Sequence, residues 1–322
     1  MARVLTGIQS TGVPHLGNLL GAIIPTIKMS KQDDNEVFSF IADMHSLTGI
    51  KDGVLIRENT YAVAATWLAF GIDIEKNVFY RQSDVPEVTE LAWYLNCFMP
   101  FNRLQLAHSF KDKSDRTSEV NAGLFSYPML MSADILLYDA EIVPVGKDQK
   151  QHLEFTRDVA GKVNHQYGEI FTIPEISLNG NAMYVPGVDG QKMSKSYGNT
   201  DNIFLPDKQL RKVIMKIKTD DKGIEDIKDP KTCTVFKLYA LLANQEEIEQ
   251  MALNYTSGNY GYGHAKQELF ELIIVKFKKE RKTFNELMAN KNILDEKLAI
   301  GAKKARETAK VTLNRIRTVL GY

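Results

Sequence analysis

The hydrophobic pattern changes character near residue 200. Before it, short runs rich in β-branched and aromatic residues alternate with longer segments of helical periodicity, a pattern typical of βαβ units and a parallel sheet. The short runs predict strands at 4–8, 37–42, 78–81 and 141–145. The segments between them predict helices at about 17–31, 53–70, 86–98 and 147–167, with Asp84 and Asp148 as N-terminal caps.

After residue 202 the strand-like runs stop. The remaining pattern predicts long helices, at about 207–217, 232–243, 245–254, 264–290 and 293–319. The sequence therefore predicts an α/β fold, with a Rossmann-like doubly wound parallel sheet over residues 1–200 and a C-terminal all-helical domain over 201–322. The last helix is a candidate for packing back on the first domain.

Composition excludes several classes of protein. The chain has 322 residues, 44% of them hydrophobic and 25% charged, which is close to the average of folded globular proteins of about two domains. Two cysteines without a CxxC pair argue against a zinc finger, an iron–sulfur site or a disulfide scaffold. Without an 18-residue apolar run or a signal peptide, we expect a cytoplasmic protein with no membrane segment.

The formal net charge of zero is an average over two unlike parts. Residues 1–200 contain 17 Lys and Arg against 23 Asp and Glu, whereas residues 201–322 contain 23 against 17. The positive excess is concentrated in the run 276–282 and in the predicted last helix. It suggests a polyanion-binding surface, although a well-solvated helix surface explains the charge equally well.

Polar or glycine-rich segments follow three of the predicted strands, at 7–12, 43–45 and 146–149. Doubly wound sheets bind ligands outside the carboxyl ends of their strands, where the strand order reverses. We therefore expect these segments to meet in one crevice.

Two motifs carry the strongest chemical signal. Pro-His-Leu-Gly-Asn at 14–18 opens a helix after the first strand, and Lys-Met-Ser-Lys-Ser at 192–196 lies in a loop flanked by glycines. Alone, the first could be an ordinary helix start and the second a polar surface loop. Their order, at the first strand–helix turn and near the end of the sheet domain, favours a shared site.

The residue types suit the binding of a nucleoside triphosphate. A helix N-terminus offers N–H groups to an anion, Gly17 lets a flat adenine or ribose approach the backbone, and His15 and Asn18 can donate hydrogen bonds to phosphate oxygens. Lys192 and Lys195 can stabilise the charge that moves onto departing pyrophosphate. These features predict nucleotidyl transfer from ATP, and the lack of a Gly-x-x-x-x-Gly-Lys-Ser/Thr motif disfavours a P-loop ATPase.

With these two motifs the chain resembles the class I aminoacyl-tRNA synthetases. The segments 6–12, 126–138 and 143–152 are similar to those of the bacterial tryptophanyl-tRNA synthetases, and the resemblance covers essentially the whole chain. It implies that L-tryptophan is activated by ATP with Mg²⁺ and transferred to tRNA(Trp) by a homodimer. Because the motifs contain no carboxylate cluster, we expect Mg²⁺ to arrive with ATP.

The resemblance also implies an ATP site. Lys113 matches a further lysine that reaches the triphosphate, whereas many bacterial relatives have Thr at the position of His15. The implied catalytic residues are Lys192, Lys195, Lys113, His15 and Asn18. The implied ATP contacts are Gln9, Ser10, Thr11, Gly17, Asn18, Gly146, Lys147, Asp148, Met183, Lys192, Met193, Ser194, Lys195 and Ser196.

Selection of the amino acid centres on one helix face. Tyr127, Met131 and Asp134 share that face by their spacing. Asp134 could merely form a cap or a salt bridge, but the resemblance implies that it accepts the indole N–H. The implied tryptophan site consists of Asp134, Leu5, His45, Tyr127, Met131, Val143, Val145 and Gln149. For His45, a supporting role in the core is as plausible as direct contact.

Three alternatives remain open. Tyrosyl-tRNA synthetases share the fold, but the apolar Leu5 stands where they usually have a tyrosine, which favours indole over phenol. A tRNA-independent nucleotidyltransferase would not need a basic helical domain. An RNA-binding paralogue without activity would not need Lys192, Lys195, Gly17 and Asp134.

Overall fold

A single parallel sheet forms the centre of the molecule. The computed structural model describes residues 2–107, 120–146, 149–178 and 184–322. The sheet has the order β3-β2-β1-β4-β5, with all four strand pairs parallel. The strands are β1 (Ala2–Gln9), β2 (Asn35–Ala42), β3 (Val78–Arg81), β4 (Ile142–Val145) and β5 (Glu175–Leu178). The order reverses between β1 and β4, which confirms the predicted doubly wound fold and places the switch point there.

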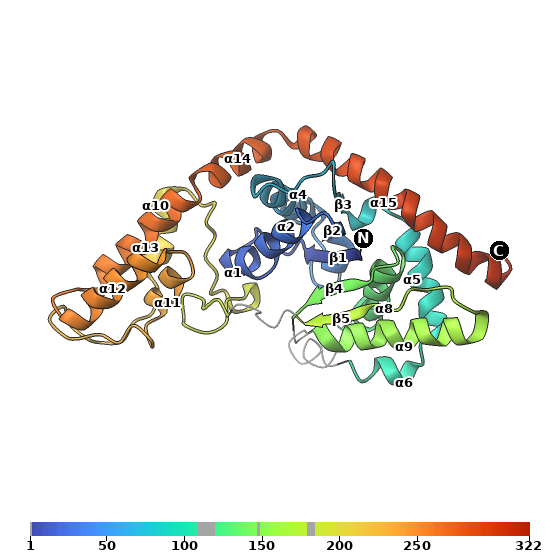
Figure 1. The fold of residues 1–322 in the computed structure, drawn as a ribbon, viewed down its shortest axis with the longest axis horizontal. Coiled ribbons are helices and arrows are strands. Elements are labelled where there is room, and N and C mark those ends of the chain that lie inside the picture. The colour runs from blue at the N-terminus through green and yellow to red at the C-terminus, as the bar shows by residue number, and fades with distance from the viewer. Residues whose placement is uncertain (1, 108–119, 147–148, 179–183) are drawn as a thin grey trace.

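Helices cover both faces of this sheet (Figure 1). Alternate strand residues explain why: Ile8, Ile41 and Phe79 belong to one buried apolar cluster, and Leu5 and Phe38 belong to the other. The first cluster includes residues from α1 (Leu16–Asn18), a π-helical turn η1 (Leu19–Ile23), α2 (Ile24–Ser30) and α4 (Gly53–Ala69). The second includes residues from α5 (Glu87–Phe98), α6 (Phe101–Leu104), α8 (Ala122–Leu136) and α9 (Lys150–Tyr167).

The chain after residue 200 is helical in the structure. Figure 1 shows α10 to α13 gathered at one end of the molecule, while α14 and α15 run back over the sheet. The helices are α10 (Asp207–Met215), α11 (Thr234–Ala240), α12 (Gln245–Ser257), α13 (Tyr262–Lys276), α14 (Lys278–Ala289) and α15 (Lys291–Leu320). Helix α14 packs on α4, and α15 packs on β3 and α5.

Helix α15 touches the sheet most closely at Gly301. A Cβ atom on Gly301 would overlap the carbonyl oxygen of Phe79 in β3. Before this glycine α15 buries Leu294 and Leu298 in the first cluster, and after it Leu313 in the second. The last helix therefore closes the β3 edge of the sheet and joins the two cores.

Three details differ from the sequence-based predictions. Asp84 is not the cap of α5: it lies in a 3₁₀ turn, η2 (Gln82–Asp84), where its Oδ2 accepts from Arg81 Nε at 2.8 Å, and Pro86 precedes the helix. The predicted helix 264–290 is two helices, broken at the buried Phe277, whose ring lies 5.8 Å from that of Phe70. Strand β5 was missed because it has a single β-branched residue, and its strand character depends on pairing with β4. The predicted cap Asp148 lies outside the described residues.

Candidate active site

The two signature segments meet at the switch point. Lys195 Nζ donates a hydrogen bond of 2.8 Å to the carbonyl oxygen of Gly12, in the loop after β1. The N–H of Gly17 points to Met193 Sδ at 3.4 Å. The two segments, about 180 residues apart in the chain, thus lie side by side, as the prediction of a shared site requires.

Gly17 lies close to two of these side chains. A Cβ atom on Gly17 would lie 3.0 Å from two ring atoms of His15 and 3.6 Å from Met193 Cβ. The glycine is therefore needed for the packing of this turn, whatever approaches it from outside.

The backbone N–H groups of this turn are already hydrogen-bonded. Leu16 N–H donates to Asp201 Oδ1 at 3.2 Å, Gly17 N–H is directed at Met193 Sδ, and Asn18 N–H donates to the His15 carbonyl at 2.8 Å. The Asn18 side chain accepts from His15 N–H at 3.2 Å. The expectation that these N–H groups are unpaired is therefore wrong for this conformation, and the side chains, above all the lysines, are left to face phosphate.

Burial sets the charges at this site. It lowers the pKa of Lys195 to about 8. It also lowers the pKa of His15 to about 4, with a further contribution from the positive charge of Lys195. At pH 7 His15 is therefore neutral and Lys195 mostly charged. The buried His15 Nδ1 has no hydrogen-bond partner among the described residues, and Lys192 is exposed.

Two residues that the sequence did not indicate support the two signature segments, Asn199 the lysine-bearing loop and Asp201 the 14–18 segment. Asn199 accepts from Ser194 N–H at 2.8 Å and donates to the carbonyl of Lys192 at 3.1 Å. Asp201 is buried, and burial raises its pKa to about 6. No local signal could have identified Asp201, because its partner Leu16 lies 185 residues away.

The other predicted ATP contacts lie around the same strand ends. Ser10 Oγ and Ser46 Oγ are 3.1 Å apart in the core. Gln9, the last residue of β1, and Thr11 are exposed, and Gly146 directly follows β4. Ser194 accepts from Ser196 N–H at 3.3 Å within the lysine-bearing loop. The predicted site residues Lys113, Lys147, Asp148 and Met183 lie outside the described residues.

A buried carboxylate belongs to α8, which covers the opposite face of the sheet from α1. Asp134 of α8 is only 2% exposed. His45 Nε2 lies 2.9 Å from Asp134 Oδ2, and Gln82 Nε2 donates to Oδ1 at 2.9 Å and Oδ2 at 2.8 Å. His45 therefore supports Asp134 directly. Gln82 was not predicted, although its place directly after β3 follows the same strand-end rule.

The remaining predicted tryptophan-site residues gather around this carboxylate. The rings of His45 and Tyr127 are 6.1 Å apart in an edge-on arrangement. The Tyr127 hydroxyl pairs with one ring nitrogen of His152, and the other ring nitrogen lies 2.9 Å from Gln149 Oε1. Leu5, Val143 and Val145 are buried in the apolar cluster of this face, and Met131 packs against it. The structure thus brings together polar and apolar groups suited to an aromatic amino acid.

Five cations of α15 are paired with groups of the chain before residue 200, one of them Lys291, which pairs with Glu58 of α4. Arg306 pairs with Glu87 at 2.9 Å, and Arg315 with Asp139 at 2.6 Å. The other two cations are Arg317, which pairs with Glu90, and Lys304, which donates to the carbonyls of Ile74 and Glu75. Much of the positive charge of α15 therefore helps to hold this helix against the chain before residue 200.

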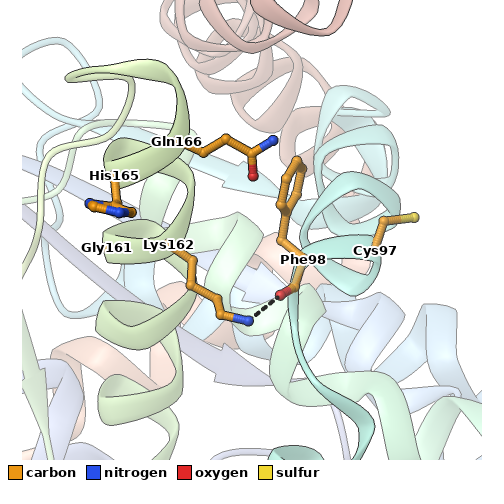
Figure 2. A pocket seen from close by; sticks show the side chains of 6 residues that line it. All are labelled: Cys97, Phe98, Gly161, Lys162, His165 and Gln166. Atoms are coloured by element: carbon orange, nitrogen blue, oxygen red, sulfur yellow. Dashed lines mark hydrogen bonds between the residues drawn. The ribbon is translucent and has the colours of Figure 1, made fainter.

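A surface groove lies away from both sites. Cys97 and Phe98 of α5 face Gly161, Lys162, His165 and Gln166 of α9, and Lys162 Nζ donates to the Phe98 carbonyl at 3.4 Å (Figure 2). None of the predicted site residues lines it.

The described part of the chain lacks two further features. It contains no group of three or more His, Cys, Asp or Glu side chains placed to hold a metal ion. Within the same residues, no helix has the length and apolar character needed to cross a bilayer.

Comparison with known proteins places the chain. The family model described as tRNA synthetases class I (W and Y) matches residues 1–278. A tryptophan–tRNA ligase of Campylobacter jejuni is 46% identical over 319 residues, 99% of either chain, and one of Fusobacterium nucleatum is 44% identical over 100% of this chain and 98% of its own. The crystal structure of the C. jejuni tryptophanyl-tRNA synthetase complexed with ADP and tryptophan superposes with a TM-score of 0.95 at 45% identity, over 99% of this chain and 100% of that one. The chain belongs to the class I tRNA synthetase family of the W and Y enzymes.

Proposed function

We propose that this protein is a tryptophan–tRNA ligase. It activates L-tryptophan with ATP and transfers the tryptophanyl group to tRNA(Trp). The observation that carries the choice of amino acid is the buried Asp134 carboxylate, placed among apolar side chains on the sheet face of Leu5 and Val143. Indole alone among the aromatic amino-acid side chains combines a large apolar ring with an N–H that such an acceptor can bind. Relatives named as tryptophan–tRNA ligases match over the full chain.

The reaction requires positioning and charge stabilisation. A tryptophan carboxylate oxygen attacks the α-phosphorus of ATP, the bond to the β-phosphate oxygen breaks, and pyrophosphate leaves. The ammonium group of Lys195, with Lys192 beside it, stabilises the charge that accumulates on pyrophosphate. A terminal ribose hydroxyl of the tRNA then attacks the tryptophanyl carbonyl and releases AMP. His15, neutral at physiological pH, can contribute a hydrogen bond but not a charge.

Mg²⁺ is part of this proposal as a companion of ATP. In the described residues the acidic and histidine side chains do not converge into a metal-binding group, and Mg²⁺ in phosphoryl-transfer sites is commonly held by substrate phosphates and water. We therefore expect the triphosphate and water to hold Mg²⁺, which would supply positive charge to the phosphate oxygens.

The basic helical region from residue 201 onward is proposed to contact the tRNA. Since five cations of α15 are paired with groups of the chain before residue 200, the exposed lysines at the junction of α13 and α14 are the better candidates for phosphate contacts. They are Lys276, Lys278, Lys279 and Lys282.

A homodimer in the cytoplasm completes the proposal. Trp93, Phe101 and Leu106 are 68%, 61% and 50% exposed on the segment between β3 and β4. Large apolar side chains that remain exposed on one segment of the chain are typical of a protein interface. Light scattering should give twice the chain mass, and Trp93→Lys should shift the protein toward monomer.

Amino-acid-dependent exchange of pyrophosphate into ATP tests the function. Among the twenty amino acids only tryptophan should support fast exchange, and phenylalanine should be rejected by about 10⁴-fold because it leaves a buried acceptor unpaired. Asp134→Ala should remove the preference for tryptophan while ATP affinity stays within a few-fold. Exchange with tyrosine instead of tryptophan, or unchanged tryptophan affinity in Asp134→Ala, would contradict the assignment.

A further inference from the structure

Gln82 is a buried polar residue to which no role has yet been given. It is 1% exposed and lies in the 3₁₀ turn directly after β3. Its side-chain Nε2 donates to both oxygens of Asp134, at 2.9 and 2.8 Å. Its side-chain Oε1 accepts from the backbone N–H of His45 at 3.4 Å. The Gln82 side-chain amide therefore contacts both Asp134 and the His45 backbone in the proposed indole site.

The hydrogen bonds distinguish the two carboxylate oxygens. A carboxylate oxygen has two lone pairs in its plane. Among the described residues, Asp134 Oδ2 has two partners, Gln82 Nε2 and His45 Nε2, whereas Oδ1 has only Gln82. Oδ1 therefore retains acceptor capacity for a ligand.

We propose that Gln82 is a positioning residue for tryptophan selection, which orients the Asp134 carboxylate with His45 so that Oδ1 accepts the indole N–H. The inference rests on the proposed function. Gln82 itself need not contact tryptophan: its N–H groups fix the plane of the carboxylate, and its carbonyl keeps the His45 segment in register.

The same hydrogen bonds also keep Asp134 an acceptor. Burial raises the pKa of Asp134, while the hydrogen bonds from His45 and Gln82 oppose that rise by stabilising the charged form. Without the amide donor, the carboxyl group takes up a proton more readily and can rotate. A protonated or rotated carboxyl no longer presents a fixed acceptor to the indole.

The test compares two substrates that differ in one group. In 3-(benzothien-3-yl)alanine a sulfur atom replaces the indole N–H, so the ring keeps its shape but cannot donate. For Gln82→Met, which removes the amide at similar volume, we expect kcat/KM for tryptophan in pyrophosphate exchange to fall by about 10- to 100-fold, the usual range for losing a hydrogen bond to a charged group. With the benzothienyl analogue the same substitution should change kcat/KM by less than about 3-fold on that reasoning.

A matched control removes another buried amide, at the opposite end of β3. Asn77, 1% exposed just before β3, donates to the carbonyls of Ser30 and Asp73 and touches no predicted site residue. Asn77→Leu should lower thermal stability and leave the ratio of tryptophan to analogue activity as in wild type. Equal losses on both substrates in Gln82→Met would overturn the inference.

A second variant covers the case in which Gln82→Met does not fold. Gln82→Glu keeps the shape, and its carboxyl can donate only when protonated, so tryptophan exchange should recover from pH 8 to pH 6 more than analogue exchange does. Parallel pH profiles for the two substrates would refute the positioning role. Wild-type protein that fails to exchange pyrophosphate with tryptophan would instead refute the proposed function, and the two failures are therefore separable.

Discussion

Replacing Lys195 by alanine tests the phosphate site most directly. Its ammonium group is held 2.8 Å from the Gly12 carbonyl, in a position shielded enough to lower its pKa to about 8. A fixed, partly desolvated donor of this kind typically contributes about 2.7–4 kcal/mol to the transition state, which is about 10²–10³-fold in rate. Lys195→Ala should therefore slow tryptophan-dependent pyrophosphate exchange by two to three orders of magnitude on that estimate, and the exposed Lys208→Ala should not.

The lowered pKa of Lys195 should also make kcat/KM for ATP depend on pH. With a pKa of about 8, Lys195 is mostly charged at pH 7 and mostly neutral at pH 9. Because kcat/KM reports groups of the free enzyme, kcat/KM for ATP should fall about tenfold per pH unit above pH 8. Lys195→Arg keeps its charge at these pH values and should lose that alkaline decline. Exchange by Lys195→Ala within a few-fold of wild type, or a flat wild-type profile up to pH 10, would refute the reasoning.

Three further predictions concern stability and tRNA binding. Gly301→Ala forces a methyl group into the β3 backbone and should lower the melting temperature by 10 °C or more, roughly the effect of several kcal/mol, whereas Gly263→Ala, with open space around its Cβ, should change it little. Burial raises the folded-state pKa of Asp201 from 3.8 to about 6, so the free energy of unfolding should fall by about 2 kcal/mol as pH rises from 4 to 7; Asp201→Asn should flatten this dependence in denaturant titrations. Lys278→Ala should weaken tRNA binding and reduce its salt dependence by about one phosphate contact, and Arg315→Ala, which breaks an internal ion pair, should leave that slope unchanged.

Local pattern was sufficient for four of the five strands and for the two signature segments. Strands with β-branched runs, such as 37–42, need no partner to be recognised, since burial on both faces of a parallel sheet demands continuous apolar residues. The segments 14–18 and 192–196 contain glycine and lysine residues, and their types and order were enough to predict phosphate binding. The short strand β5 and the break at Phe277 were not predicted, because each depends on packing partners distant in the chain.

The sequence by itself determined the fold class, the nucleotide chemistry and the family, because these follow from periodicity and from residues close together in the chain. Only the tertiary structure decided which groups meet: Asp201 on the first helix, Gln82 on Asp134, and the cations of α15 on the sheet region. Each of these contacts joins residues 52 to 233 positions apart. A hydrogen bond depends on distances of about 3 Å, and no local pattern encodes such a distance between remote segments until the chain has packed around a common core.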